Sequence, residues 1–294
     1  MTEERINAQT ILCCLIGNPV EHSLSPALHN ACFRECGLNW VYVAFRVTDI
    51  AGGLAGIRAL GIRGASVTIP YKISALKYLD DIDPVARTIG SINTIVNQDG
   101  CLIGFNSDGT GALQALREQG HDPAGKRILV LGSGGAARAI CVSLALHAPP
   151  QILTIMGIVQ DEMVTLERDL RTVSGCVVQT QQLDTDTLAR ILPETDIVIN
   201  CTPVGMYPNI HASPIPAAFL KPRHVVFDVV YNPLETRLLL DAQKAGAAVV
   251  PGIGMFINQA AVQFQLWTGR EAPRHIMHEV VMQHLRPHDQ KSGA

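Results

Sequence analysis

The chain has 294 residues and a formal net charge of -3, with 23 Lys and Arg against 26 Asp and Glu. This length is enough for a buried core and predicts two domains. Because no excess of basic residues is present to attract nucleic acid or an anionic membrane surface, we expect a small-molecule partner and neither a nucleic-acid nor a membrane partner.

The sequence carries no clear targeting, disulfide or metal signal. The first ten residues, MTEERINAQT, lack the basic region of a signal peptide, and no apolar run approaches the length of a bilayer span. The eight cysteines include no C-x-x-C pair, and the ten histidines show no H-E-x-x-H spacing. We therefore expect a soluble, cytoplasmic protein with reduced thiols and no metal site.

The N-terminal third alternates strands with helices. Apolar runs predict strands at Ile11 to Ile16, Val41 to Val47 and Ala65 to Thr68. Ser25 before Pro26 predicts a helix N-terminus, and a second helix is expected from Ile50 to about Leu60. Strands separated by helices predict a mostly parallel sheet.

A different pattern closes this first unit. Pro70 is expected to open a helix that carries Lys72, and the acidic stretch Asp80 to Pro84 is expected to be a connector. Gln98-Asp99-Gly100 predicts a hairpin turn, because Asp-Gly suits the turns that join antiparallel strands. The two strands of this hairpin are expected at Asn93 to Asn97 and Cys101 to Phe105.

A second alternating unit follows the helix expected from Asp108 to about Glu118 and the junction HDPAGK. Strands are predicted at Ile128 to Leu131, Ile152 to Met156, Ile197 to Cys201, Val225 to Val229 and Ala248 to Val250. Two further helices are expected, from Met255 to Thr268 and from Arg274 to Leu285. The fold class is thus α/β, with an N-terminal, mostly parallel domain and a doubly wound, Rossmann-type domain.

The stretch KRILVLGSGGAARA, from Lys126 to Ala139, predicts a strand, a tight glycine turn and a helix start. Its spacing fits G-x-G-x-x-A, in which backbone amides and the helix N-terminus bind a pyrophosphate. Similar turns also occur where nothing binds, so this loop alone does not establish a dinucleotide site.

Polar residues recur at the predicted strand ends, where ligands collect in open parallel sheets. They are Ser23, Ser25, Thr68, Lys72, Asn93, Asp108, Tyr231 and Gln259. Each has a structural alternative: a helix cap for Ser25 or Asp108, a backbone contact for Thr68, a turn for Asn93, and an exposed surface position for Lys72. The convergence of an amine, a carboxylate, hydroxyls and amides favours a site.

These residues lie within the stretches GNPVEHSLSPALHN, GASVTIPYK, GSINTI, GFNSDGTG, GSGGAA, NCTPVGM, DVVYNP and GMFINQAAVQF. In this order the stretches resemble the motifs of the shikimate dehydrogenase family, from about Ile16 to Gly269. The resemblance implies a substrate domain of residues 1–108 and 254–294, a dinucleotide domain of residues 109–253, and a cleft between them. The activity it implies is reversible, NADP-linked oxidation of shikimate to 3-dehydroshikimate.

The resemblance also implies roles for individual residues. Lys72 and Asp108 would be catalytic, Ser23, Ser25 and Tyr231 would bind the substrate carboxylate, and Thr68, Asn93 and Gln259 would bind the ring hydroxyls. The cofactor-binding set would be Gly132, Ser133, Gly134, Gly135, Ala136, Val229, Gly252 and Met255. Independently of the family, oxidation of an alcohol needs a base, and a shielded lysine beside a carboxylate can serve as one.

The sequence departs from the family where the adenosine ribose would bind. NADP-dependent members usually show N-R-T with a further basic residue at this place. This chain reads Met156-Gly157-Ile158-Val159-Gln160 instead, and no Lys or Arg occurs between Met156 and Arg168. Asp161 and Glu162 follow the strand and could favour NAD instead. We expect NADP from the family pattern, with NAD or both cofactors as the alternative.

Other readings remain open at this point. Quinate or amino-shikimate could replace shikimate, since pockets discriminate weakly between such similar rings. A folate-type methylene dehydrogenase has a similar plan, but the S-x-S-P loop argues against it. A shikimate or nucleotide sensor without catalysis is the alternative of another class, and it would not need both Lys72 and Asp108. The chain is expected to be a monomer or a homodimer.

Overall fold

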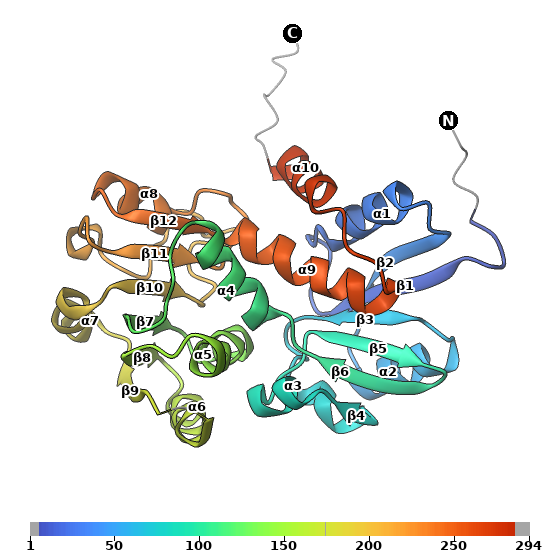
Figure 1. Ribbon diagram of the computed structural model, residues 1–294, viewed down its shortest axis with the longest axis horizontal. Coiled ribbons are helices and arrows are strands. Elements are labelled where there is room, and N and C mark those ends of the chain that lie inside the picture. Colours follow the sequence, from blue (N-terminus) through green and yellow to red (C-terminus); the bar gives the residue numbers. More distant parts are fainter. Residues whose placement is uncertain (1–5, 174, 286–294) are drawn as a thin grey trace, which may run out of the picture.

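The structure is a computed structural model that describes residues 6–173 and 175–285. It contains two six-stranded sheets, which lie beside each other in Figure 1. The first has the order β2-β1-β3-β5-β6-β4. Its strands are β1 (Ile11–Gly17), β2 (Trp40–Arg46), β3 (Gly64–Val67), β4 (Asp81–Ile82), β5 (Thr94–Gln98) and β6 (Cys101–Phe105).

The first sheet is mixed. β1 pairs in parallel with β2 and β3, and β5 pairs antiparallel with both β3 and β6. The β5–β6 turn contains Asp99 and Gly100, both with positive φ, as the predicted Asp-Gly hairpin requires. The helices of this half are α1 (Ser25–Glu35), α2 (Ile50–Ala59), α3 (Pro84–Ile89), α9 (Gly252–Thr268), α10 (Arg274–Leu285) and the 3₁₀ helix η1 (Ser74–Tyr78).

The second sheet is parallel throughout, with the order β12-β11-β10-β7-β8-β9. Its strands are β7 (Arg127–Leu131), β8 (Ile152–Gly157), β9 (Val177–Gln182), β10 (Ile197–Asn200), β11 (Val225–Asp228) and β12 (Ala248–Pro251). The connecting helices are α4 (Asp108–Glu118), α5 (Gly135–His147), α6 (Gln160–Val173), α7 (Thr185–Ile191), α8 (Arg237–Lys244) and the short η2 (Leu192–Glu194) and η3 (Ala217–Phe219). The strand order reverses at β7, as in a doubly wound Rossmann-type sheet, so the predicted fold class is confirmed.

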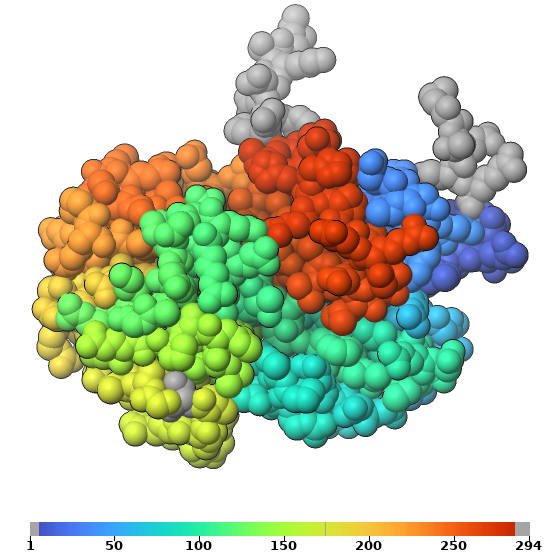
Figure 2. All heavy atoms as spheres, in the orientation of Figure 1, coloured from blue at the N-terminus to red at the C-terminus, as the bar shows by residue number. Residues whose placement is uncertain are grey.

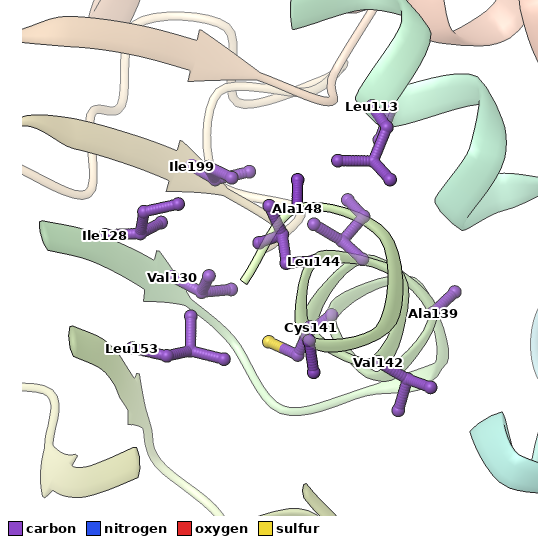
Figure 3. Packing of buried hydrophobic residues seen from close by; sticks show 14 of the residues in the cluster. Leu113, Ile128, Val130, Ala139, Cys141, Val142, Leu144, Ala148, Leu153 and Ile199 are labelled. Atoms are coloured by element: carbon purple, nitrogen blue, oxygen red, sulfur yellow. The ribbon is translucent and has the colours of Figure 1, made fainter. Parts of the chain in front are cut away.

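Helix α5 packs its apolar face on the middle of the second sheet. Figure 3 shows Cys141 and Leu144 of this helix beside the strand residues Ile128, Val130 and Leu153. All five side chains are buried. This packing holds the N-terminus of α5, and with it the glycine loop, at the carboxyl edge of β7.

Helices α4 and α9 lie side by side between the two sheets (Figure 1). Their close approach depends on Gly111, where an added Cβ would lie 2.9 Å from the backbone nitrogen of Gln259. Gly109 allows a similar approach to α5, since a Cβ there would lie 1.9 Å from Ser143 Oγ. In Figure 2 the C-terminal helices, in red, adjoin α4, in green, on one face of the molecule.

The C-terminal helix α9 also completes the core of the first half. Trp267 is buried and donates a hydrogen bond from Nε1 to the carbonyl of Ile95, 3.0 Å away. Its ring lies over Gly64, where an added Cβ would be only 2.2 Å from the indole. The first sheet is therefore covered by a segment from the other end of the chain.

Three local predictions were wrong or incomplete. Pro70 does not open an α-helix: Lys72 lies in a turn before η1, because its carbonyl accepts from the backbone of Ile92 instead of continuing a helix. Ser25 does not cap α1 with its side chain; Leu24 holds the cap position, and the amide of Ser25 bonds Ser23 Oγ at 3.2 Å. The prediction also lacked α3 and the edge strand β9, and the expected connector Asp80 to Pro84 contains the short edge strand β4, which pairs with β6.

The domain boundaries inferred from the sequence stay a prediction. Across residues 6–173 and 175–285, none of the helices combines the length and the apolar character needed to cross a bilayer.

Candidate active site

The side chains of Lys72 and Asp108 form an ion pair between the turn after β3 and the first residue of α4. The side chains are 18% and 7% exposed, so Lys72 is not the surface lysine that its sequence alone allowed. Asp108 does not cap α4 either, because its carboxylate bonds Lys72 and Asn93. A partly shielded amine beside a carboxylate can give up or accept a proton.

Asn93 holds the other oxygen of this carboxylate. Its Nδ2 donates to Asp108 Oδ1 at 2.8 Å and to Ser107 Oγ at 2.9 Å. Its Oδ1 accepts from the backbone amide of Ser107 at 2.9 Å and from Thr94 Oγ1 at 2.7 Å. The buried amide of Asn93 is thus fully engaged, and Asp108 has a fixed orientation.

Three of the other predicted substrate residues lie after β3, after β11 and in helix α9. Thr68 follows β3 and packs on Gly17, Tyr231 follows β11 and stacks on Phe256 with ring centroids 4.3 Å apart, and Gln259 Nε2 donates to the Phe256 carbonyl at 2.9 Å. Burial raises the pKa of Tyr231 to about 12, so its hydroxyl stays protonated and can donate.

Within the described residues, no hydrogen bond links Ser23, Ser25, Thr68, Tyr231 or Gln259 to the Lys72–Asp108 pair. Their part in binding substrate stays a prediction. The loop that carries Tyr231 follows β11, the fifth strand of the second sheet in chain order.

The glycine loop reaches the Lys72 side chain. Gly132 has φ +103, a conformation that favours glycine, and Gly134 precedes the first residue of α5, Gly135. A Cβ on Gly135 would lie 3.6 Å from both Cβ and Cδ of Lys72. Free backbone amides at a 13-residue helix start suit a pyrophosphate.

The remaining cofactor residues predicted from the sequence lie at two places. Ser133 and Ala136 belong to the glycine loop and α5. Val229 follows β11, and Gly252 opens α9 so close to it that an added Cβ would lie 2.7 Å from the Val229 carbonyl. Met255 is buried against α4. Their contact with a cofactor stays a prediction.

Glu162 occupies the exit of β8, where a dinucleotide ribose lies in this fold. Ser133 Oγ donates to Glu162 Oε2 at 2.8 Å, and a Cβ on Gly157 would lie 3.1 Å from the same hydroxyl. The nearest arginine on each side of this segment along the chain, Arg138 before it and Arg168 after it, pairs with Asp169. The lack of a basic clamp stays a prediction from the sequence, and in the structure Glu162, not Asp161, is the acid that bonds the loop.

Two cavities in the described structure lie away from the pair. One, of about 570 Å³, is lined by α7, α8 and the segment 211–217, and the other, of about 340 Å³, by α4, α9 and α10. Neither is lined by Lys72 or Asp108. The cleft implied by the resemblance stays a prediction.

Sequence reasoning missed two residues next to this site, Thr94 and Gln263. Both are buried and both join the hydrogen bonds that end at Asp108. The available signal was the position of Gln263 one helical turn after Gln259, which places a polar group on the inner face of α9.

The family described as shikimate dehydrogenase substrate binding domain matches residues 15–95, and that described as shikimate 5'-dehydrogenase C-terminal domain matches residues 252–282. The NADP(+) shikimate dehydrogenase of Moorella thermoacetica is 44% identical over 279 residues, which cover 94% of both chains.

Two solved structures agree with this match. A shikimate dehydrogenase in complex with NADP+ is 42% identical, has a TM-score of 0.89 and covers 96% of this chain and 98% of its own. Shikimate 5-dehydrogenase from Listeria monocytogenes, in complex with shikimate and NAD, is 38% identical with a TM-score of 0.87 and covers 94% and 98%. With this similarity along nearly its whole length, the chain belongs to the shikimate dehydrogenase family.

Proposed function

We propose that this chain catalyses the reversible, NADP-linked oxidation of shikimate to 3-dehydroshikimate, a step in aromatic amino acid biosynthesis. The observation that carries the proposal is the Lys72–Asp108 pair, shielded from water and next to a glycine loop of dinucleotide-binding form. Relatives that cover nearly the whole chain are named for this activity. A sensor would not require the pair, so catalysis is favoured over binding alone.

In the proposed reaction, Lys72 removes the proton of the hydroxyl that is oxidised and returns it in the reverse direction. Asp108 holds the amine of Lys72 and orients it, while Asn93 fixes Asp108. The protonated amine stabilises negative charge that develops on the substrate oxygen. The hydride leaves the same carbon, and bound NADP would supply its acceptor.

The substrate and cofactor contacts are proposed as the family motifs suggest. Ser23, Ser25 and Tyr231 bind the carboxylate, and Thr68 and Gln259 bind the ring hydroxyls. Asn93 joins them by exchanging its hydrogen bond to Ser107 Oγ for one to a ring hydroxyl. The glycine loop holds the pyrophosphate, with residues 109–253 as the dinucleotide domain and the two terminal segments as the substrate domain. A cytoplasmic location and a monomeric or homodimeric state complete the proposal.

Replacement of Lys72 tests the role of the pair. We expect Lys72→Met and Lys72→Ala to lower kcat about 10²- to 10⁴-fold with little change in KM for shikimate, since general acid–base catalysis contributes this much. Lys77→Met is the control, because Lys77 is exposed on η1 and lies over the Tyr78 ring. Turnover near the wild-type value in either Lys72 variant would refute the assignment.

Substrate and cofactor are tested together. Formation of reduced nicotinamide is followed from shikimate and from quinate, each with NADP and with NAD. We expect shikimate with NADP to give turnover. A signal only with quinate would show that quinate, not shikimate, is the substrate. No signal in any of the four reactions would favour the sensor.

A further inference from the structure

The buried core of the first half contains a line of polar side chains that ends at the Lys72–Asp108 pair. Gln263, on α9, is 2% exposed and forms hydrogen bonds through both the oxygen and the nitrogen of its side-chain amide. Its Oε1 accepts from Ser66 Oγ of β3 at 2.9 Å. Its Nε2 donates to the Asn93 carbonyl at 3.2 Å and to Thr94 Oγ1 at 3.0 Å.

The line continues from Thr94 to the ion pair. Thr94, buried at the start of β5, donates its hydroxyl proton to Asn93 Oδ1 at 2.7 Å. Asn93 Nδ2 then donates to Asp108 Oδ1 at 2.8 Å, and Asp108 Oδ2 bonds Lys72. Three intervening side chains thus connect the far C-terminal helix to the amine.

The directions of these hydrogen bonds follow from chemistry. The Asn93 carbonyl can only accept, so the nitrogen of Gln263 must face it, and the second N–H of that group points to Thr94. The Thr94 hydroxyl accepts this bond, and its own proton therefore goes to Asn93 Oδ1. The amide nitrogen of Asn93 is left to face Asp108, an orientation that the Ser107 backbone amide also favours.

We propose that Gln263 is a positioning residue, which acts through Thr94 and Asn93 to keep Asp108 oriented against Lys72. The inference rests on the proposed function. Gln263 touches neither Lys72 nor Asp108, and its effect on turnover arises because it fixes both the backbone and the hydroxyl that hold Asn93. Loss of its donors leaves Asn93 and the Asp108 carboxylate free to tilt, and small displacements of catalytic groups slow a reaction strongly.

The experiment compares Gln263→Met, which keeps length and removes the amide, with Gln265→Met on the exposed face of the same helix. We expect Gln263→Met to lower kcat about 10-fold, with KM for shikimate changed less than about 2-fold, and to move the pH of half-maximal kcat. Gln265→Met should match the wild type in all three. A folded Gln263→Met with wild-type kcat and pH profile overturns the inference.

Substitutions of Thr94 test the same series of hydrogen bonds at a different residue. Thr94→Val removes the hydroxyl and keeps the shape, whereas Thr94→Ser keeps the hydroxyl and should restore most of kcat. Because both changes interrupt one line, Gln263→Met combined with Thr94→Val should be little slower than Thr94→Val alone. Full additivity of the two losses, or no loss in Thr94→Val, would show that Gln263 acts elsewhere. If Gln263→Met does not fold, the two Thr94 variants decide.

The proposed function and the positioning role of Gln263 are tested by different measurements. A wild type that oxidises neither shikimate nor quinate refutes that function only. The side-chain amide signal of Asn93, assigned in ¹⁵N-labelled protein through Asn93→Ala, reports the geometry without turnover. It should shift in Gln263→Met and stay in place in Gln265→Met, and an unmoved signal in Gln263→Met overturns the positioning role.

Discussion

The carboxylate of Glu162 brings a negative charge to the exit of β8, where it accepts a hydrogen bond from Ser133 of the glycine loop. A carboxylate at this place can accept from ribose hydroxyls and repels the additional phosphate of NADP. Residues 157–167 contain no Lys or Arg to offset it. We therefore expect the charge of Glu162 to influence the preference of this chain between NADP and NAD.

Neutralising this charge should move the balance toward NADP. We expect Glu162→Gln to raise the ratio of kcat/KM with NADP to kcat/KM with NAD by about 3- to 10-fold, because a repulsion near the surface is worth about 1 kcal/mol. The measurement is initial rates with both cofactors at constant ionic strength. Asp161→Asn is the matched control, as no hydrogen bond from the described residues to its carboxylate is seen. A ratio that is unchanged or lower in Glu162→Gln would contradict this account.

At the scale of elements, α4 depends on glycine on two faces. Gly109 faces α5 and Gly111 faces α9, and in both cases the neighbouring helix leaves no room for a methyl group. Asp108 is the first residue of this helix. The packing of α4 therefore fixes both the contact between the two halves and the position of a proposed catalytic carboxylate.

Gly111→Ala should separate α4 from α9. We expect the free energy of unfolding to fall by about 1–3 kcal/mol, because the added methyl would lie 2.9 Å from the Gln259 backbone and 3.1 Å from the Met255 carbonyl. Urea denaturation measures the change. The control is Gly56→Ala in α2, where nothing lies within 4 Å, and where alanine should be neutral or stabilising. Equal effects of the two substitutions would refute the packing argument.

Elements with strong local signals were predictable from the sequence, and those set by distant contacts were not. The helix from Asp108 to Glu118 and the Asp-Gly hairpin match the structure because their patterns are local. The turn at Lys72 was missed because a backbone bond from Ile92 decides it. Strand β9 was missed because its sequence, VVQTQQ, is polar and lies at a sheet edge.

Only part of the site was predictable from the sequence. Lys72, Asp108 and Asn93 stood out by residue type at strand ends, and the structure brings these three together. Gln263 did not, because its position one turn after Gln259 indicates a polar group on the inner face of α9 but not its partners, which lie about 170 residues earlier in the chain. Long-range hydrogen bonds of this kind have no local sequence pattern.

At the scale of the whole molecule, Arg138 links the two halves. Its Nε donates to the carbonyl of Ile89 at the end of α3, 2.8 Å away, and its Nη2 pairs with Asp169 of α6 at 2.7 Å. The side chain is only 10% exposed. A buried guanidinium with two partners from opposite halves resists their relative movement.

Arg138→Met should weaken this link. We expect the free energy of unfolding to fall by about 2 kcal/mol, since a buried carbonyl loses its donor and Asp169 loses its shielded partner. Arg168 is the other arginine that pairs with Asp169, and its side chain is 72% exposed. Arg168→Met should therefore lower the free energy of unfolding by about 0.5 kcal/mol or less. Chemical denaturation of both variants gives the comparison. A loss in Arg168→Met as large as that in Arg138→Met would argue against the link.

Because α9 covers the first sheet, that sheet cannot be fully buried until α9 has been synthesised. Strands β1 to β6 leave the ribosome well before Trp267, which packs over Gly64 and bonds Ile95. The second sheet needs no such late segment for its own strand pairing and can form in between. The nascent chain must therefore carry an uncovered apolar face while residues 106–266 are made, and chaperones can bind there during that interval.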